Sequence, residues 1–119
     1  MSTAIERIGT TPRMSKIVRH AGIVYLCGQT AVGASTPDIA AQTTEALARV
    51  DALLTEAGSS RARILSAIIH LKDIAQFGEM NTVWEAWLPP GAAPARTTVQ
   101  ASLAAADLLF EVTVTAAVD

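Results

Sequence analysis

Cysteine, aromatic residues and long apolar runs are all scarce in this sequence. The single cysteine, Cys27, excludes an intramolecular disulfide and suits a reducing compartment. No apolar run is long enough for a signal peptide or a membrane-spanning helix, so we expect a cytoplasmic protein with no membrane partner. Because only 4% of the residues are aromatic, we expect a core built from Ala, Val, Leu and Ile.

Basic charge and metal-ligand spacings are also lacking. The formal net charge of −2 leaves no basic field for nucleic acid, so we expect none as a partner. A small anionic substrate would then need a local cation. His20 and His70 stand alone in separate segments, without carboxylate or cysteine spacing, so we expect no metal site. No phosphate-binding or nucleotide-binding motif is present, and we expect no cofactor.

The 119 residues predict one domain, residues 1–119, that contains alternating strands and helices. Thr36 as N-cap, Pro37 at the first helical position and Asp38 near the positive end of the dipole predict a helix that runs to Gly58. Ala21 fits poorly in the tight turn expected between the second and third strands. The expected strands are Ile5–Ile8, Met14–His20, Ile23–Gln29 and Ile64–Lys72, followed by one strand through Arg96 and one through Glu111; a second helix carries Phe77, Met80, Trp84 and Trp87 on one stripe.

This order of elements predicts an α+β fold, in which two helices cover one face of a single sheet. The other sheet face must then meet solvent or further subunits. The strand from Ile64 supports this prediction with apolar residues on both sides. One side would carry Leu65, Ala67, Ile69 and Leu71, and the other Ile64 and Ile68.

The strands through Arg96 and Glu111 carry the candidate chemistry. A period of two places Arg96 and Thr98 on one face of the first strand and Glu111 on one face of the second. A guanidinium grips a carboxylate with two parallel hydrogen bonds, and a carboxylate among apolar and threonine residues is costly to bury without a partner. We expect Arg96 and Glu111 to open onto one crevice. On the residues alone, the alternatives are a surface arginine loosely paired with an acid, which is the more frequent role of such a residue, and a solvated glutamate at a subunit rim.

Several motifs resemble the RidA/YjgF family of small imine and enamine deaminases. The run from Pro94 to Val99, with Glu111 fifteen positions after the arginine, is similar to its C-terminal signature. Further similar segments are Gly28-Gln29, Glu56-Ala57-Gly58 and Met80-Asn81 ahead of Trp84; Arg13-Met14-Ser15 and Trp84-Glu85-Ala86-Trp87 resemble the YoaB-like branch.

The resemblance implies a chorismate mutase-like fold, one mixed six-stranded sheet with two helices, packed by three subunits into a barrel with clefts between subunits. It implies hydrolysis of 2-imino or 2-enamino acids to 2-keto acids and ammonia. Arg96 would hold the substrate carboxylate and Glu111 would orient or deprotonate the attacking water. Gly28, Thr98, Asn81 and Trp84 would line the site, and Met14 would replace a tyrosine found in RidA itself, which favours an apolar substrate side chain.

Two further functions are compatible with the sequence. One is a ligand-binding or protein-protecting trimer without turnover, in which Glu111 would not matter. The second is RNA cleavage, an activity attributed to some relatives, which the acidic charge balance disfavours.

Overall fold

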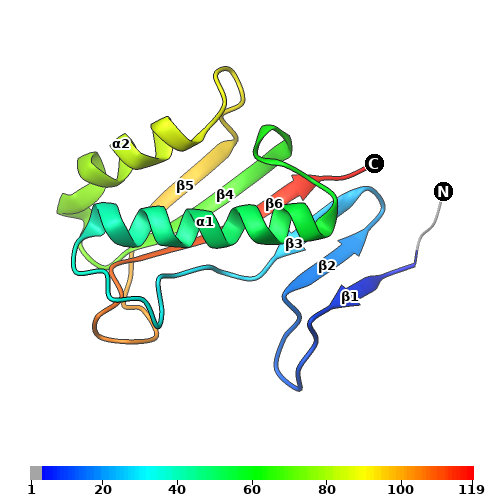
Figure 1. Cartoon of the computed structure of the whole chain (residues 1–119), viewed down its shortest axis with the longest axis horizontal. Coiled ribbons are helices and arrows are strands. Elements are labelled where there is room, and N and C mark those ends of the chain that lie inside the picture. Colours follow the sequence, from blue (N-terminus) through cyan, green and yellow to red (C-terminus); the bar gives the residue numbers. More distant parts are fainter. Residues whose placement is uncertain (1–3) are drawn as a thin grey trace.

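The computed structural model describes residues 4–119 as a six-stranded sheet with two helices on one face (Figure 1). The helices are α1 (Ile39–Ala57) and α2 (Phe77–Trp87), and two short 3-10 turns are η1 (Arg61–Arg63) and η2 (Ile74–Gln76). The strands are β1 (Glu6–Ile8), β2 (Ile17–His20), β3 (Ile23–Leu26), β4 (Ile64–Leu71), β5 (Ala95–Gln100) and β6 (Phe110–Ala117). None of the helices in this part of the chain has the length and apolarity needed to cross a bilayer.

The sheet is mixed, with the strand order β1-β2-β3-β6-β4-β5. All neighbours are antiparallel except β4 and β5, which run parallel because the chain crosses over through η2 and α2 between them. The α+β fold expected from the order of elements is therefore confirmed. β4 is an interior strand, whereas β5 forms one edge of the sheet.

The helix α1 supplies much of the core. Its buried stripe includes Ala46, Leu47, Val50 and Leu54, each at most 1% exposed. These side chains pack against the helix-facing side of the sheet, and each fully buried Leu or Val contributes roughly 1.5 to 3 kcal/mol through removal of apolar area from water. As expected, the core contains few aromatic side chains.

The two ends of α1 differ in how well the sequence predicts them. Gly58 ends the helix in the left-handed conformation, at φ 82°, as expected. The prediction of Thr36 as N-cap was wrong, because the carboxylate of Asp38 caps the helix and accepts a hydrogen bond from the Ala41 N–H at 2.7 Å. Pro37 therefore precedes the helix rather than occupying its first turn.

The β2–β3 hairpin is confirmed, with shorter strands than predicted. Ala21 and Gly22 have φ angles of 52° and 81°, so the alanine accepts the left-handed conformation that a two-residue hairpin turn requires. β2 begins at Ile17 rather than Met14, and β3 ends at Leu26. Directly after β3, the Cys27 N–H still donates to the Lys16 carbonyl at 3.0 Å, and the chain then pairs with β6 at the isolated bridge between Gln29 and Val112.

A β-bulge in β4 reverses part of its predicted pattern. The register shifts between Ile64 and Ser66, so Ile64 is buried while Leu65 is 47% exposed. The prediction that Leu65 shares a face with Ala67 was therefore wrong. The sheet face opposite the helices, which we call the open face, carries the exposed apolar side chains of Tyr25, Ile68 and Val99.

Candidate functional site

Arg96 lies on the helix-covered face of the sheet, beside α2. Its register partner on β4 is the buried Ala67, which fixes the face to which both side chains point. Arg96 Nη1 donates to Asn81 Oδ1 at 2.8 Å. The guanidinium carbon is 5.4 Å from the ring centroid of Phe77 and 5.6 Å from that of Trp84, within the range of cation–π attraction.

This guanidinium is half-buried and has no carboxylate partner among residues 4–119. The ion pairs of that range involve Arg19, Arg49, Arg61 and Arg63. Burial lowers the pKa of Arg96, and a distant attraction from Glu85 only partly opposes this effect. Because an arginine still stays charged at neutral pH, the side chain presents an incompletely compensated positive charge with unused donors.

Thr98 adds an unused polar group on the same face. Its register partner is the fully buried Ile69, so Thr98 points to the helix-covered side, as Arg96 does. The Thr98 hydroxyl is buried and has no hydrogen-bond partner in the described part of the chain. Buried hydroxyls are almost always paired, so the unpaired Thr98 hydroxyl is an exception that calls for an explanation. We call Arg96, Asn81, Phe77, Trp84 and Thr98 the arginine cluster.

Glu111 lies on the opposite side of the sheet. Its partner across β4 is His70, and the alternation along β6 buries Phe110 and Val112 while Glu111 faces the open side. The Glu111 side chain lies over Gly28: a Cβ added to Gly28 would be 2.6 Å from Glu111 Oε2. The Glu111 carboxylate therefore occupies space that is free only because Gly28 has no side chain.

Gly28 and its neighbours complete this second group. The Gly28 carbonyl accepts a hydrogen bond from Gln29 Nε2 at 3.1 Å, and the same amide donates to Cys27 Sγ at 3.2 Å. Burial raises the pKa of the Cys27 thiol, so it stays protonated and poorly nucleophilic at neutral pH. We call Glu111, Gly28 and Gln29 the glutamate cluster.

A single chain thus brings together two groups of the predicted site residues but does not join them. Arg96, Thr98, Asn81 and Trp84 meet on the helix-covered face, whereas Glu111 and Gly28 meet on the open face. Met14 belongs to neither group. It is 41% exposed in the β1–β2 loop, where its N–H donates to the Thr11 hydroxyl and its carbonyl accepts from the Thr11 N–H. The expected contact of Arg96 and Glu111 with one bound molecule would need residues from two chains.

Two hollows of the described chain involve neither cluster. One, of about 460 Å³, is lined by residues that include Arg19 and His20, and another, of about 700 Å³, by residues that include Gln42 and Asp107. Among residues 4–119, no three His, Cys, Asp or Glu side chains gather as a metal site would require.

Phe77 is a site residue that the sequence did not single out. The helical spacing predicts Phe77 on the apolar stripe of α2, but the residue is 38% exposed and its ring lies against the Arg96 guanidinium. Its position four residues before Asn81 and seven before Trp84 could have indicated this placement, because residues at these spacings share one helix face.

Comparison with known proteins agrees with the fold and its motifs. Residues 4–118 match the family model described as Endoribonuclease L-PSP. The chain is 39% identical to the RutC family protein YoaB of Escherichia coli K12, over 96% of this chain and 98% of that protein. It is 35% identical to a RutC family protein of Haemophilus ducreyi, over 97% of each.

Solved structures give the same result. A crystal structure of a YjgF family member from Neisseria meningitidis superposes with a TM-score of 0.93 at 38% identity, over 98% of this chain and 97% of that one. The Mycobacterium tuberculosis protein Rv2704, a member of the YjgF/YER057c/UK114 family, superposes with a TM-score of 0.82 at 31% identity, over 90% and 88% of the two chains. The resemblance drawn from the motifs is thereby confirmed, and the chain belongs to the YjgF/RidA family, also named Rid or RutC.

Proposed function

We propose that the protein hydrolyses 2-imino acids, and the 2-enamino acids that tautomerise to them, to 2-keto acids and ammonia. The observation that carries this proposal is the half-buried guanidinium of Arg96, which has unused donors and forms no ion pair within the described chain. Water adds to the imine carbon, the carbon–nitrogen bond breaks and nitrogen leaves as ammonia. No electrons are transferred, so the reaction balances without a redox group.

The arginine cluster supports the binding half of this reaction. Asn81 accepts a hydrogen bond from Nη1 at 2.8 Å, and the rings of Phe77 and Trp84 lie within cation–π range of the guanidinium. Its remaining N–H groups form the planar fork that binds a carboxylate through two hydrogen bonds. The Thr98 hydroxyl is a further donor on the same face.

The glutamate cluster supports the chemical half. A carboxylate at Glu111 accepts a proton from water as that water attacks the imine carbon, and the departing nitrogen takes up the proton. The Gly28 carbonyl has one lone pair engaged by Gln29 and a second available to an imine N–H. Since an imine is already electrophilic, correct placement of the water supplies much of the acceleration.

Because the two clusters lie on opposite sheet faces, we propose a homotrimer in which each site takes its arginine cluster from one subunit and its glutamate cluster from the next. Two features support this assembly. The open face exposes the apolar side chains of Tyr25, Ile68 and Val99, each 41 to 47% accessible. The outer edge of β5 carries backbone groups that no other strand of the described chain pairs.

Replacement of Arg96 tests the reaction. With imines generated by an amino-acid oxidase, Arg96→Ala should lose roughly 2 to 5 kcal/mol of transition-state binding, a factor of about 30 or more in kcat/KM. Arg63→Ala is the matched control, because Arg63 pairs with Asp119 at 2.8 Å and belongs to neither cluster. Imines with apolar side chains come first, since Met14 favours them. Equal ammonia release by Arg96→Ala and wild type would end the proposal.

Mixed trimers test whether a site spans two subunits. Arg96→Ala and Glu111→Gln should each lose most of the wild-type kcat/KM when assayed alone. In trimers assembled at random from equal amounts of both, about a quarter of the sites combine an intact arginine with an intact glutamate, so about a quarter of the activity should return. If one chain supplied both residues to its own site, every mixed trimer would stay inactive.

Carboxylate binding without turnover is the second candidate function, and the arrangement of the clusters is the observation that favours it. The arginine cluster is assembled within one chain, whereas the water-activating carboxylate lies on the other face. Titration with a 2-keto acid separates binding from catalysis. A binding function would be supported if the protein bound the 2-keto acid but released no ammonia from any oxidase-generated imine, and if Glu111→Gln bound the 2-keto acid with the same affinity as wild type.

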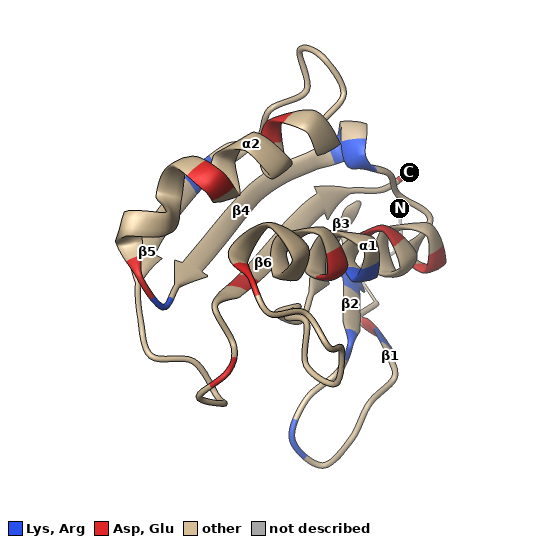
Figure 2. Cartoon of the chain, turned by 60° about the vertical axis from the view of Figure 1, so that its left-hand side comes forward, with Lys and Arg blue, Asp and Glu red and all other residues tan. Residues whose placement is uncertain are grey.

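RNA cleavage, suggested by the description of the family model, has less support. Figure 2 shows acidic and basic residues intermingled along the helices and loops, and Arg19, Arg49, Arg61 and Arg63 each pair with an acidic side chain. Single-stranded RNA needs a continuous basic groove with stacking aromatic side chains. We therefore expect no retention of single-stranded RNA at any salt concentration.

A further inference from the structure

The two tryptophans of the chain lie against each other next to Arg96. The Trp84 ring, 4% exposed, is in contact with the Arg96 guanidinium on one side and with Trp87 on another. The Trp84 and Trp87 centroids are 5.7 Å apart and their planes are inclined by 36°, a favourable arrangement for an aromatic pair. Whatever holds Trp87 in place therefore also holds the aromatic surface on which Arg96 lies.

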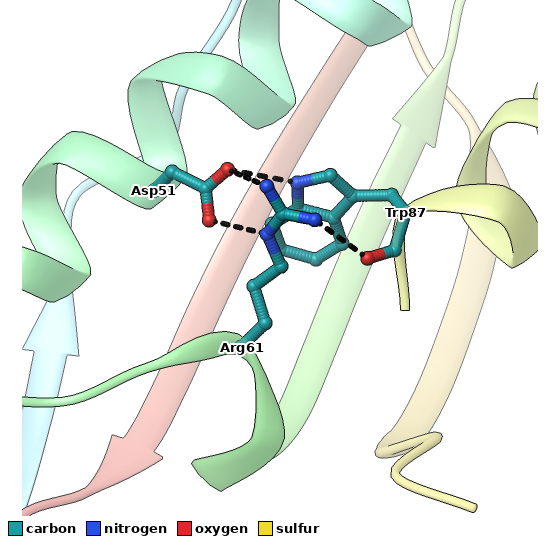
Figure 3. A network of polar contacts seen from close by, with 3 residues as sticks. All are labelled: Asp51, Arg61 and Trp87. Carbon is teal, nitrogen blue, oxygen red and sulfur yellow. Dashed lines mark hydrogen bonds and ion pairs between the residues drawn. The ribbon is translucent and has the colours of Figure 1, made fainter. Parts of the chain in front are cut away.

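Asp51 and Arg61 both form hydrogen bonds with Trp87 (Figure 3). Trp87 Nε1 donates to Asp51 Oδ2 at 3.1 Å. Arg61 donates to both carboxylate oxygens of Asp51 at 2.7 Å and to the Trp87 carbonyl at 3.0 Å. Its guanidinium carbon is also 5.1 Å from the Trp87 ring centroid. We call Asp51, Arg61 and Trp87 the tryptophan clamp.

The tryptophan clamp links α1 and η1 to the C-terminal end of α2. Trp87 is the last residue of α2 and is followed by Leu88, Pro89 and Pro90, so the final carbonyls of the helix have no continuing turn. Arg61, from η1, binds one of these carbonyls, and Asp51, from α1, binds the indole. An isolated exposed ion pair contributes little, but two parallel hydrogen bonds within a network have the geometry that makes such pairs count.

We infer that the tryptophan clamp positions Arg96: by holding Trp87 against Trp84, it sets the direction in which the guanidinium presents its free donors to a carboxylate. Asp51, Arg61 and Trp87 touch no substrate in this scheme and are positioning residues. The inference rests on the proposed role of Arg96 as the carboxylate-binding group. Loss of the clamp lets Trp87 turn and Trp84 shift, so that Arg96 samples directions that bind poorly.

Three variants with a matched control test the tryptophan clamp. Arg61→Ala removes its centre, Trp87→Phe keeps an aromatic ring without the indole donor, and Asp51→Asn keeps an acceptor for the indole. Arg63→Ala is the control, because Arg63 lies on the same 3-10 turn and is paired with Asp119 without contact to a tryptophan. Carboxylate binding is common to ground and transition states, so its weakening appears in KM rather than kcat.

We expect KM for the imino acid, and Kd for the corresponding 2-keto acid, to rise about 3- to 10-fold in Arg61→Ala and Trp87→Phe, with kcat within about twofold of wild type. Asp51→Asn should retain most of the affinity, and Arg63→Ala should match wild type. In Trp87→Phe, Trp84 is the one tryptophan left, so its fluorescence reports 2-keto acid binding next to Arg96 directly.

The outcomes separate the two proposals. If Arg96→Ala binds and turns over as wild type does, the proposed function fails. If Arg96→Ala is impaired while Arg61→Ala and Trp87→Phe titrate with the same midpoints as Arg63→Ala, the tryptophan clamp has no positioning role. A fall in kcat at unchanged KM in the clamp variants would also overturn the inference.

Discussion

A methyl group at Gly28 should displace the Glu111 carboxylate without disturbing the backbone. Gly28 has no positive φ, so alanine is compatible with its conformation. The added Cβ would meet Glu111 Oε2 at 2.6 Å, Cδ at 3.0 Å and Cγ at 3.3 Å. Ordinary contact begins near 3.4 Å, so the nearest oxygen must move by 3.4 − 2.6, about 0.8 Å. All three contacts are to one flexible side chain, which can yield.

A shift of this size matters for chemistry more than for stability. Misplacement of a catalytic group by about 1 Å costs up to roughly 100-fold in rate, so we expect Gly28→Ala to lower kcat for imine hydrolysis by about 10- to 100-fold. Because the carboxylate moves rather than the core, the melting temperature should fall by no more than about 4 °C. The assay is ammonia release from oxidase-generated imines, with thermal unfolding in parallel.

Two controls identify the cause. Gly78→Ala, in α2, adds a methyl group with no atom within 4 Å, and should leave activity intact while stabilising the helix by up to about 1 kcal/mol. In a Glu111→Ala background, the methyl group at position 28 meets none of those three atoms and should cost nothing further. Full activity in Gly28→Ala would refute the assigned role of the Glu111 carboxylate, and equal penalties in both backgrounds would refute the contact.

Three further predictions address assembly, folding and reactivity. If the proposed trimer packs through the open face, Ile68→Lys should be monomeric in size-exclusion chromatography with light scattering, whereas Val32→Lys, at a more exposed loop position, should stay trimeric; trimers in both would disprove that packing. Asp38→Ala should lower the free energy of unfolding in urea by about 1 kcal/mol through loss of the α1 cap, and an unchanged value would contradict the capping contact. Because burial raises the pKa of the Cys27 thiol, less thiolate is present at pH 8 than in a free cysteine peptide, so alkylation by iodoacetamide should be slower. Glu111→Gln should speed it slightly, since that charge also raises the pKa.

Local patterns in the sequence predict most of the fold. The spacing of Ala46, Leu47, Val50 and Leu54 identifies the buried stripe of α1, and Gly58 marks its end. The failures concern choices between neighbouring residues. Threonine and aspartate are both good N-cap residues, and Asp38 rather than Thr36 has this role because the helix begins at Ile39. The bulge at Ile64 and Ser66 depends on pairing with a strand more than forty residues away, so no local pattern reveals it.

The candidate site shows a deeper limit of the same kind. A period of two correctly places Arg96 and Thr98 on one face of β5, and Glu111 on one face of β6. It cannot relate the two faces, because that relation depends on how both strands register against β4. The register pairs Arg96 with a buried alanine and Glu111 with His70 on the open side. The motifs therefore identify the residues of each cluster, whereas only the three-dimensional fold separates the clusters.

The β2–β3 turn leaves room for improvement by protein engineering. Ala21 occupies a left-handed conformation, at φ 52°, that costs an L-residue with a Cβ about 1 kcal/mol. Asparagine tolerates this conformation better, and the turn lies away from the residues of both clusters. Ala21→Asn therefore offers a gain in thermal tolerance that leaves ligand recognition unaltered, and such a background would make the more damaging substitutions easier to purify.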